Sequence, residues 1–118
     1  MKKLRKVGFY KELDHGDSDG DSLKEAINKL CLEKLESILL YLHSAKLFIA
    51  SPGLVEDVLD GGNIIGPLSI YTDGEWSWPS DLAYYVKKYK VGLPNDFVEH
   101  MEAVGWRVAE FNIEEVEL

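Results

Sequence analysis

The fold is decided by residues 70–82, which read Ile70-Tyr71-Thr72-Asp73-Gly74-Glu75-Trp76-Ser77-Trp78-Pro79-Ser80-Asp81-Leu82. This stretch predicts a strand, a tight turn, a second strand and the start of a helix. Asp73-Gly74 stands between β-branched and aromatic residues, which favours a two-residue type I′ turn, because both central positions of that turn need positive φ. We therefore expect a β-hairpin over residues 68–78.

The predicted hairpin collects aromatic side chains on one face. A two-residue turn pairs Thr72 with Glu75 and Tyr71 with Trp76. Because side chains alternate along a strand, Tyr71, Trp76 and Trp78 then point the same way. Such a face is either a wall of the core, since each ring buries a large apolar area, or a binding platform, since Trp and Tyr are enriched in interface hot spots.

The rest of the chain supplies helices and short strands around this hairpin. The capping box Ser22-Leu23-Lys24-Glu25 starts a helix that runs to about Ser44 with a break near Cys31-Leu32. Apolar spacing and turn residues give the other elements. We expect helices over 54–59, from an N-cap at Ser80 to Lys90, and from Pro94 to Gly105, and strands over 6–13, 47–50 and 106–110.

These elements indicate an α+β fold in which about four helices pack on a small antiparallel sheet centred on the 68–78 hairpin. The length of 118 residues suits a single domain over residues 1–118. Within it, we expect residues 14–21 to form a flexible acidic loop and residues 112–118 to form an acidic tail.

The net charge of −8 limits the classes of partner. Nucleic acids and acidic membranes are disfavoured, because both are bound through Lys and Arg. An acidic surface favours a basic protein partner by steering it electrostatically. Cys31 is interpreted as a buried, reduced thiol, and no apolar run is long enough to span a membrane or to act as a signal peptide. A cytoplasmic location is the expectation.

The Asp-rich loop was compared with the calcium-loop pattern. With Gly20 at the sixth position, His15 falls at the first and Ala26 at the twelfth, where the pattern needs an acidic or amide ligand and a glutamate. The pattern fails at both ends. We therefore expect a hydrated flexible loop and assign no metal, with a weak divalent-cation site as the less favoured alternative. No other motif implies a cofactor.

No catalytic motif is present in the sequence, which lowers the expectation of an enzyme. The three histidines lie in different segments, with His43 interpreted as a helix C-cap and His100 as a surface residue. The best candidate grouping places carboxylates beside aromatic rings, where desolvation raises a carboxyl pKa. Turn and capping roles also explain Asp73 and Asp81. The candidate binding residues are Tyr71, Asp73, Glu75, Trp76, Trp78, Asp81 and Tyr84.

A resemblance adds to this interpretation. Residues 72–86, Thr72-Asp73-Gly74-Glu75-Trp76-Ser77-Trp78-Pro79-Ser80-Asp81-Leu82-Ala83-Tyr84-Tyr85-Val86, are followed by Leu93-Pro94, Phe97 and His100. Together they resemble a family of small uncharacterised bacterial proteins that share the core TDG-x-W-x-WP-x-DL-x-YYV. The likeness extends from about Ser51 to Trp106. It implies no activity, cofactor or catalytic residue.

Three functional hypotheses follow. The first is a small cytoplasmic protein-binding module that engages a basic protein, as immunity proteins engage toxin nucleases. The second is a small-ligand binder or enzyme with a pocket lined by Trp76, Trp78 and Tyr84. The third is a structural subunit that forms a homo-oligomer through an exposed aromatic patch.

Overall fold

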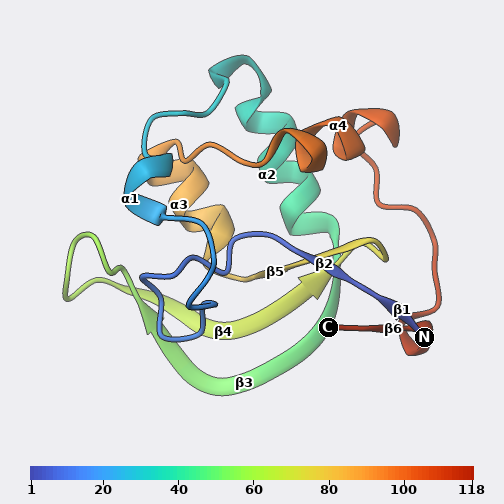
Figure 1. Ribbon diagram of the computed structural model, residues 1–118, viewed down its shortest axis with the longest axis horizontal. Helices are drawn as coiled ribbons and strands as arrows, with labels where there is room; N and C mark the ends of the chain where they lie inside the picture. Colours follow the sequence, from blue (N-terminus) through green and yellow to red (C-terminus); the bar gives the residue numbers. More distant parts are fainter.

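The structure is a computed structural model that describes residues 1–118. Four helices lie on one side of a four-stranded sheet, and a second, two-stranded sheet joins the two ends of the chain (Figure 1). The elements are β1 Lys2–Lys3, β2 Arg5–Lys6, α1 Leu23–Ala26, α2 Leu35–Ser44, β3 Lys46–Glu56, β4 Ile64–Thr72, β5 Trp76–Pro79, α3 Leu82–Tyr89, α4 Asn95–Ala103 and β6 Val116–Glu117, with single 3-10 turns at Leu32–Lys34 and Ile113–Glu115. The predicted α+β class is confirmed.

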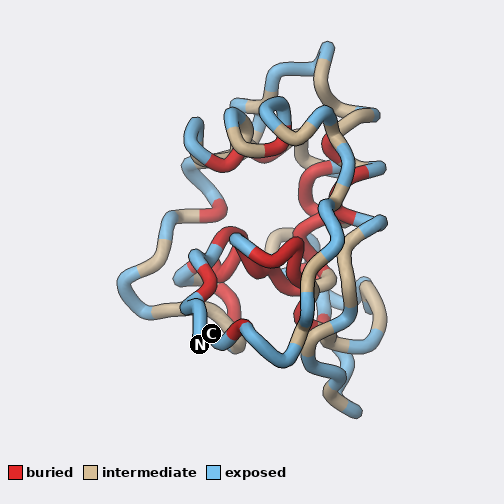
Figure 2. Tube along the Cα trace, turned by 90° about the vertical axis from the view of Figure 1, so that its right-hand side faces the viewer, coloured by how far each residue is buried: buried red, intermediate tan, exposed pale blue.

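The main sheet has the strand order β2-β5-β4-β3. The pairs β3–β4 and β4–β5 are antiparallel, whereas β2 runs parallel to β5. In the small sheet, β1 runs parallel to β6, which brings the two ends of the chain side by side, as Figure 2 shows. Part of the acidic tail is therefore strand β6, and its Val116 is buried.

The predicted hairpin is present as β4 and β5, but its turn and register differ from the prediction. Thr72 lies opposite Ser77 rather than Glu75, and Tyr71 lies opposite Trp78. Only Gly74 has positive φ, at 95°, so the turn is not type I′. The Asp73 side chain builds the wider turn instead, because its Oδ1 accepts the backbone N–H groups of Glu75 and Trp76. The shift of two residues leaves each side chain on its predicted face.

The aromatic face belongs to the core. Trp76 is 4% exposed and Trp78 is 1% exposed. Their ring centroids lie 4.9 and 5.5 Å from that of Phe97, a fully buried residue of α4. In Figure 2 the buried residues gather on the inner sides of the helices and the sheet. Of the two interpretations of this face, the structure supports the core wall for both indoles.

The predicted helix over 54–59 is wrong, because β3 continues through this segment to Glu56. Leu54 and Val55 pair with Pro67 and Gly66 of β4, after a register shift that accommodates Pro52-Gly53. The apolar spacing of residues 54–59 is typical of a helix, but pairing with the distant strand β4 overrides this local preference. Strand β3 is thus eleven residues long and lies at the edge of the sheet.

Other local predictions have mixed outcomes. The capping box at Ser22 is confirmed, because Ser22 Oγ accepts the N–H of Glu25, and the helix after it breaks before α2 as expected. Ser80 does not cap α3, since its hydroxyl donates to Pro67 O and accepts from Ser69 N on β4. Cys31 is exposed, not buried.

Both predicted terminal strands differ from the structure. The segment 6–13 is irregular after Lys6, although its apolar residues are buried. The segment 106–110 forms no strand, and its first residue, Trp106, has φ of 61°, which is incompatible with extended backbone.

The acidic loop over 14–21 is tied to the segment before it. Asp17 N donates to Phe9 O, and Lys11 N donates to Asp21 O. At Gly16 a Cβ atom would lie 1.8 Å from Tyr10 O, so only glycine fits where the loop crosses that backbone. This packing turns His15 toward the molecule, where it meets Asp81.

Replacement of Trp78 tests the core. Trp78→Ala should lower the free energy of unfolding by about 3–5 kcal/mol, because it removes a buried ring and leaves a cavity. Leu40 is 66% exposed on α2, so Leu40→Ala should cost less than about 0.5 kcal/mol. Urea denaturation of both variants measures the difference. Equal, small losses would mean that the aromatic face does not hold the core.

Candidate functional site

Three carboxylates are buried in this small protein. Asp57 is 1% exposed, Asp73 is 5% exposed and Asp81 is 0% exposed. Aspartate is almost never fully buried unless it is paired, because desolvation of the charge is costly. The partners of each carboxylate therefore show what the three sites can do.

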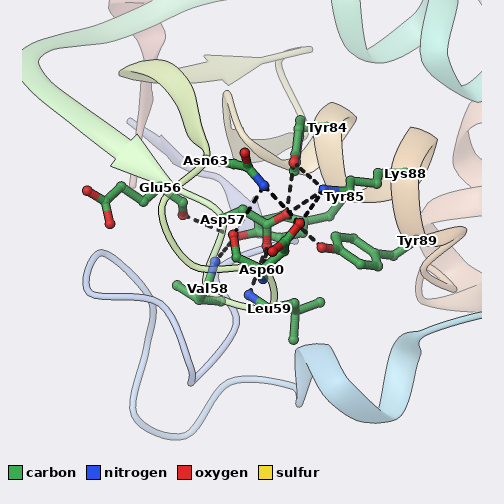
Figure 3. Close-up of polar contacts among 10 residues, drawn as sticks. All are labelled: Glu56, Asp57, Val58, Leu59, Asp60, Asn63, Tyr84, Tyr85, Lys88 and Tyr89. Carbon is green, nitrogen blue, oxygen red and sulfur yellow. Dashed lines mark hydrogen bonds and ion pairs between the residues drawn. The ribbon is translucent and has the colours of Figure 1, made fainter.

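Asp57 lies directly after β3 and faces α3 (Figure 3). Its Oδ2 accepts the hydroxyls of Tyr84 and Tyr89 at 2.8 and 2.7 Å, and Lys88 Nζ lies 3.3 Å away. Its Oδ1 accepts the backbone N–H groups of the turn, with Leu59 N at 2.8 Å and Asp60 N at 3.0 Å. One carboxylate thus joins the turn after β3 to three residues of a single helix.

The spacing on α3 explains this convergence. Tyr84 and Lys88 are four positions apart, so they share one side of the helix, and the adjacent Tyr89 reaches the same carboxylate with its long side chain. Burial alone would raise the pKa of Asp57, but the Tyr89 and Tyr84 hydroxyls and the two backbone N–H groups lower it to about 2. Asp57 is therefore ionised at neutral pH. The pKa of Lys88 is raised by its hydrogen bonds to the Tyr84 hydroxyl and to the carboxylates of Asp57 and Asp60.

The chemistry of the Asp57 cluster is structural. A carboxylate offers about four lone-pair positions, and five donors already surround Asp57. No acceptor capacity is left for a metal ion or a substrate. More generally, the structure contains no group of three or more His, Cys, Asp or Glu side chains placed to hold a metal ion.

Asp73 joins the hairpin turn to α2 and α4. While its Oδ1 holds the turn, its Oδ2 accepts the Tyr41 hydroxyl at 2.5 Å and His100 Nε2 at 3.0 Å. Burial, together with Asp73, raises the pKa of Tyr41. His100 is therefore not the plain surface residue that the sequence predicted, although 22% of its side chain is exposed. The only hydroxyl beside Asp73 and His100 is that of Tyr41. It already donates to Asp73, so it is not a free nucleophile.

Asp81 has the least complete set of partners. His15 Nε2 lies 2.9 Å from its Oδ2, close enough for an ion pair but not aligned as a hydrogen bond. Its Oδ1 is buried without any partner. The prediction that Asp81 lies in the first turn of α3 is wrong, because Asp81 is the N-cap residue before the helix, and its side chain makes no capping hydrogen bond.

The seven candidate residues from the sequence do not converge on one site. Trp76 and Trp78 lie in the core, and Tyr71 is half-buried opposite Trp78. Asp73 contacts Tyr41 and His100, Asp81 contacts His15, and Tyr84 contacts Asp57. Glu75 forms an exposed ion pair with Lys2. No pattern in the sequence pointed to the roles of His15, Asp57 and His100. The one local signal was the polar stripe Tyr84, Lys88 and Tyr89 on α3.

One small pocket touches this group. Tyr71 and Trp78 line it together with His43 and three neighbours, and its volume is about 200 Å³. Sites for small molecules usually enclose about 300–1,000 Å³. Trp76 and Tyr84 make their contacts elsewhere, so the pocket contains one of the three residues that the small-ligand hypothesis named.

The most prominent exposed feature is apolar and lies on the outer strand. Leu47 is 52% exposed, Ile49 is 44% exposed and Leu54 is 63% exposed, and all three belong to β3. We call them the β3 row. Because β3 pairs only with β4, its other edge has backbone N–H and C=O groups without a neighbouring strand. Exposed apolar groups at such an edge are typical of protein interaction sites.

Searches with protein-family models, curated protein sequences and solved structures found no match to this chain. None of the helices has the length and apolar content needed to cross a bilayer. Function is therefore inferred from the chain's own residues.

Replacement of Asp57 should give a pH-dependent loss of stability. Since the folded-state pKa is about 2 and the ordinary value is 3.8, the ionised form stabilises the fold above about pH 4, and this contribution is lost as the pH falls towards 2. Asp57→Asn should therefore cost about 2 kcal/mol at pH 7. The cost should shrink below pH 4 in urea denaturation series. Asp19→Asn, at an exposed loop position, is the control and should show no such trend.

The Tyr41 hydroxyl should also stabilise the fold. Tyr41→Phe removes a donor from the buried Asp73 carboxylate and should cost about 1–3 kcal/mol. Tyr71→Phe is the matched control, because Tyr71 is half-buried on β4 and its hydroxyl is not bonded to a carboxylate. Thermal or urea denaturation compares the two. A loss no larger for Tyr41→Phe than for Tyr71→Phe would contradict the role of this hydrogen bond.

Proposed function

We propose that this chain is a small cytoplasmic protein-binding module whose partner is a basic protein, in the manner of an immunity protein that binds a toxin. The observation that carries the proposal is the β3 row at the free edge of the sheet. An exposed, long, apolar edge strand is a hazard for aggregation unless it serves as an interface. The presence of such a strand here therefore supports a binding role.

The edge suits recognition by strand addition. In this mode, main-chain hydrogen bonds supply affinity and alternate side chains supply specificity. Strand β3 has eleven residues, and apolar side chains are exposed both before and after Pro52-Gly53. A partner segment that pairs with this edge would cover the β3 row and satisfy the open backbone groups.

The distribution of charge supports a basic partner. Six of the thirteen lysines and arginines are held in ion pairs with carboxylates, among them Lys2, Arg5 and Lys34, and seven are not. Many exposed carboxylates have no ion pair, namely Asp14, Asp19, Asp21, Glu25, Glu33, Glu36, Glu56, Glu99, Glu114, Glu115 and Glu117. This excess raises the association rate with a basic partner. It repels a second copy of the same chain, which makes the homo-oligomer hypothesis the weaker one.

The test uses the chain as bait in extracts of its native host, followed by measurement with the purified partner. We expect a basic protein that binds wild type with one-to-one stoichiometry. The double variant Leu47→Thr/Ile49→Thr keeps β-branched residues on β3 and should weaken binding by at least about tenfold, or 1.4 kcal/mol. Isothermal titration with the purified pair measures this change.

The control for the binding test is Leu40→Gln. Leu40 is also large and exposed, but it lies on α2, so its replacement should leave the affinity within about twofold. If Leu40→Gln weakens binding and the β3 variant does not, the interface lies on the helices. If the purified partner is acidic, the electrostatic part of the proposal is wrong.

A further inference from the structure

A second hollow lies where the acidic loop meets the end of β3. Leu13, Asp14 and His15 line one part of it, and Leu54, Glu56 and Val58 line another. Its volume is about 490 Å³, within the range of sites that take a ligand group. The hollow is continuous with the β3 row, because Leu54 belongs to both. A segment bound along the edge of β3 would therefore reach it.

The lining combines apolar walls with two free carboxylates. Leu13, Leu54 and Val58 provide apolar surface, while Asp14 and Glu56 are exposed acids that have no ion pair. This combination suits a long cationic side chain, whose aliphatic stem covers apolar surface while its charged end meets carboxylates. An acidic group would be repelled by these carboxylates, and a neutral donor would form weaker hydrogen bonds with them than a charged one.

The buried Asp81 adds negative charge behind the same hollow. His15 lines the hollow, and its Nε2 faces Asp81 Oδ2 on the inner side. Because His15 faces Asp81 on the inner side, Asp14 and Glu56 are the carboxylates left open to the hollow. The second oxygen of Asp81 has no partner at all, which leaves this buried carboxylate incompletely compensated. A cation bound in the hollow lowers that electrostatic cost.

We propose that this hollow receives an arginine side chain of the basic partner that docks on the edge of β3. The inference rests on the proposed function and names the group that the partner inserts. Arginine fits better than lysine, because the planar guanidinium presents several donors that can serve Asp14 and Glu56 together and can lie flat on apolar walls.

The test uses two short synthetic peptides with the sequence acetyl-Thr-Val-Arg-Val-Thr-amide and its counterpart with citrulline in place of arginine. Citrulline keeps the shape of the side chain but has no charge. Amide chemical shifts of the ¹⁵N-labelled full chain are followed during titration. We expect the arginine peptide to shift the amides of residues 13–15 and 54–58, and to bind about tenfold or more tightly than the citrulline peptide.

Substitutions in the hollow complete the test. Asp14→Asn and Glu56→Gln should each weaken the arginine peptide by about threefold to tenfold, since each removes one carboxylate partner. Glu36→Gln removes the same charge from α2 and should change the affinity by less than about twofold. All three positions are exposed, and the amide spectrum of each variant verifies that it is folded.

Three results would overturn the inference. They are equal binding of the two peptides, an equal effect of Glu36→Gln and Glu56→Gln, and an absence of shifts at the hollow at millimolar peptide. None of these results affects the outcome of the binding test with the Leu47→Thr/Ile49→Thr variant. If that test succeeds while the peptide test fails, the module binds its partner through β3 without inserting an arginine here.

Discussion

The carboxylate of Asp57 is the contact on which the arrangement of the sheet depends. Strand β5 pairs with only the last three residues of β4, so most of the β3–β4 ribbon has no third strand beside it. An isolated two-stranded ribbon is marginally stable in water. Asp57 ties the far end of this ribbon to α3 through two tyrosine hydroxyls and Lys88. The β3 row is held in a defined place because this contact exists.

The same contact explains what Tyr84 and Tyr85 contribute to the fold. Tyr84 donates its hydroxyl to Asp57, and the neighbouring Tyr85 is fully buried and bonds the backbone of residues 56 and 58. Burial raises the pKa of Tyr85 to about 12. Both rings secure the ribbon to the helix. The aromatic density of the TDG-x-W-x-WP-x-DL-x-YYV stretch thus reflects the support of the sheet, and the accessible apolar surface lies on β3.

Local signals in the sequence were sufficient for some elements. The capping box at Ser22, the turn residues at Asp73-Gly74 and the Pro94 start of α4 each act within a few residues, and each predicted the right kind of element. The length of β3 could not be predicted, because it depends on pairing with β4 across a turn. The partners of Asp57, Asp73 and Asp81 lie far along the chain, and no spacing rule relates an aspartate to a distant histidine or tyrosine. Ser80 is a further example. It was expected to cap α3, but its hydroxyl forms hydrogen bonds with the backbone of β4 instead.

The parallel pairing of β1 with β6 sets an order of events for folding. Strand β1 can pair only when residues 116–117 are present, and β2 can pair only when β5 is present. Strands β3, β4 and β5, in contrast, follow one another along the chain. Contacts between neighbours in sequence form with little loop-closure entropy, and contacts between distant segments form late. During synthesis from the ribosome, the first strands therefore stay unpaired while the β3–β5 meander assembles. The β1–β6 pair forms only after residues 116–117 have emerged.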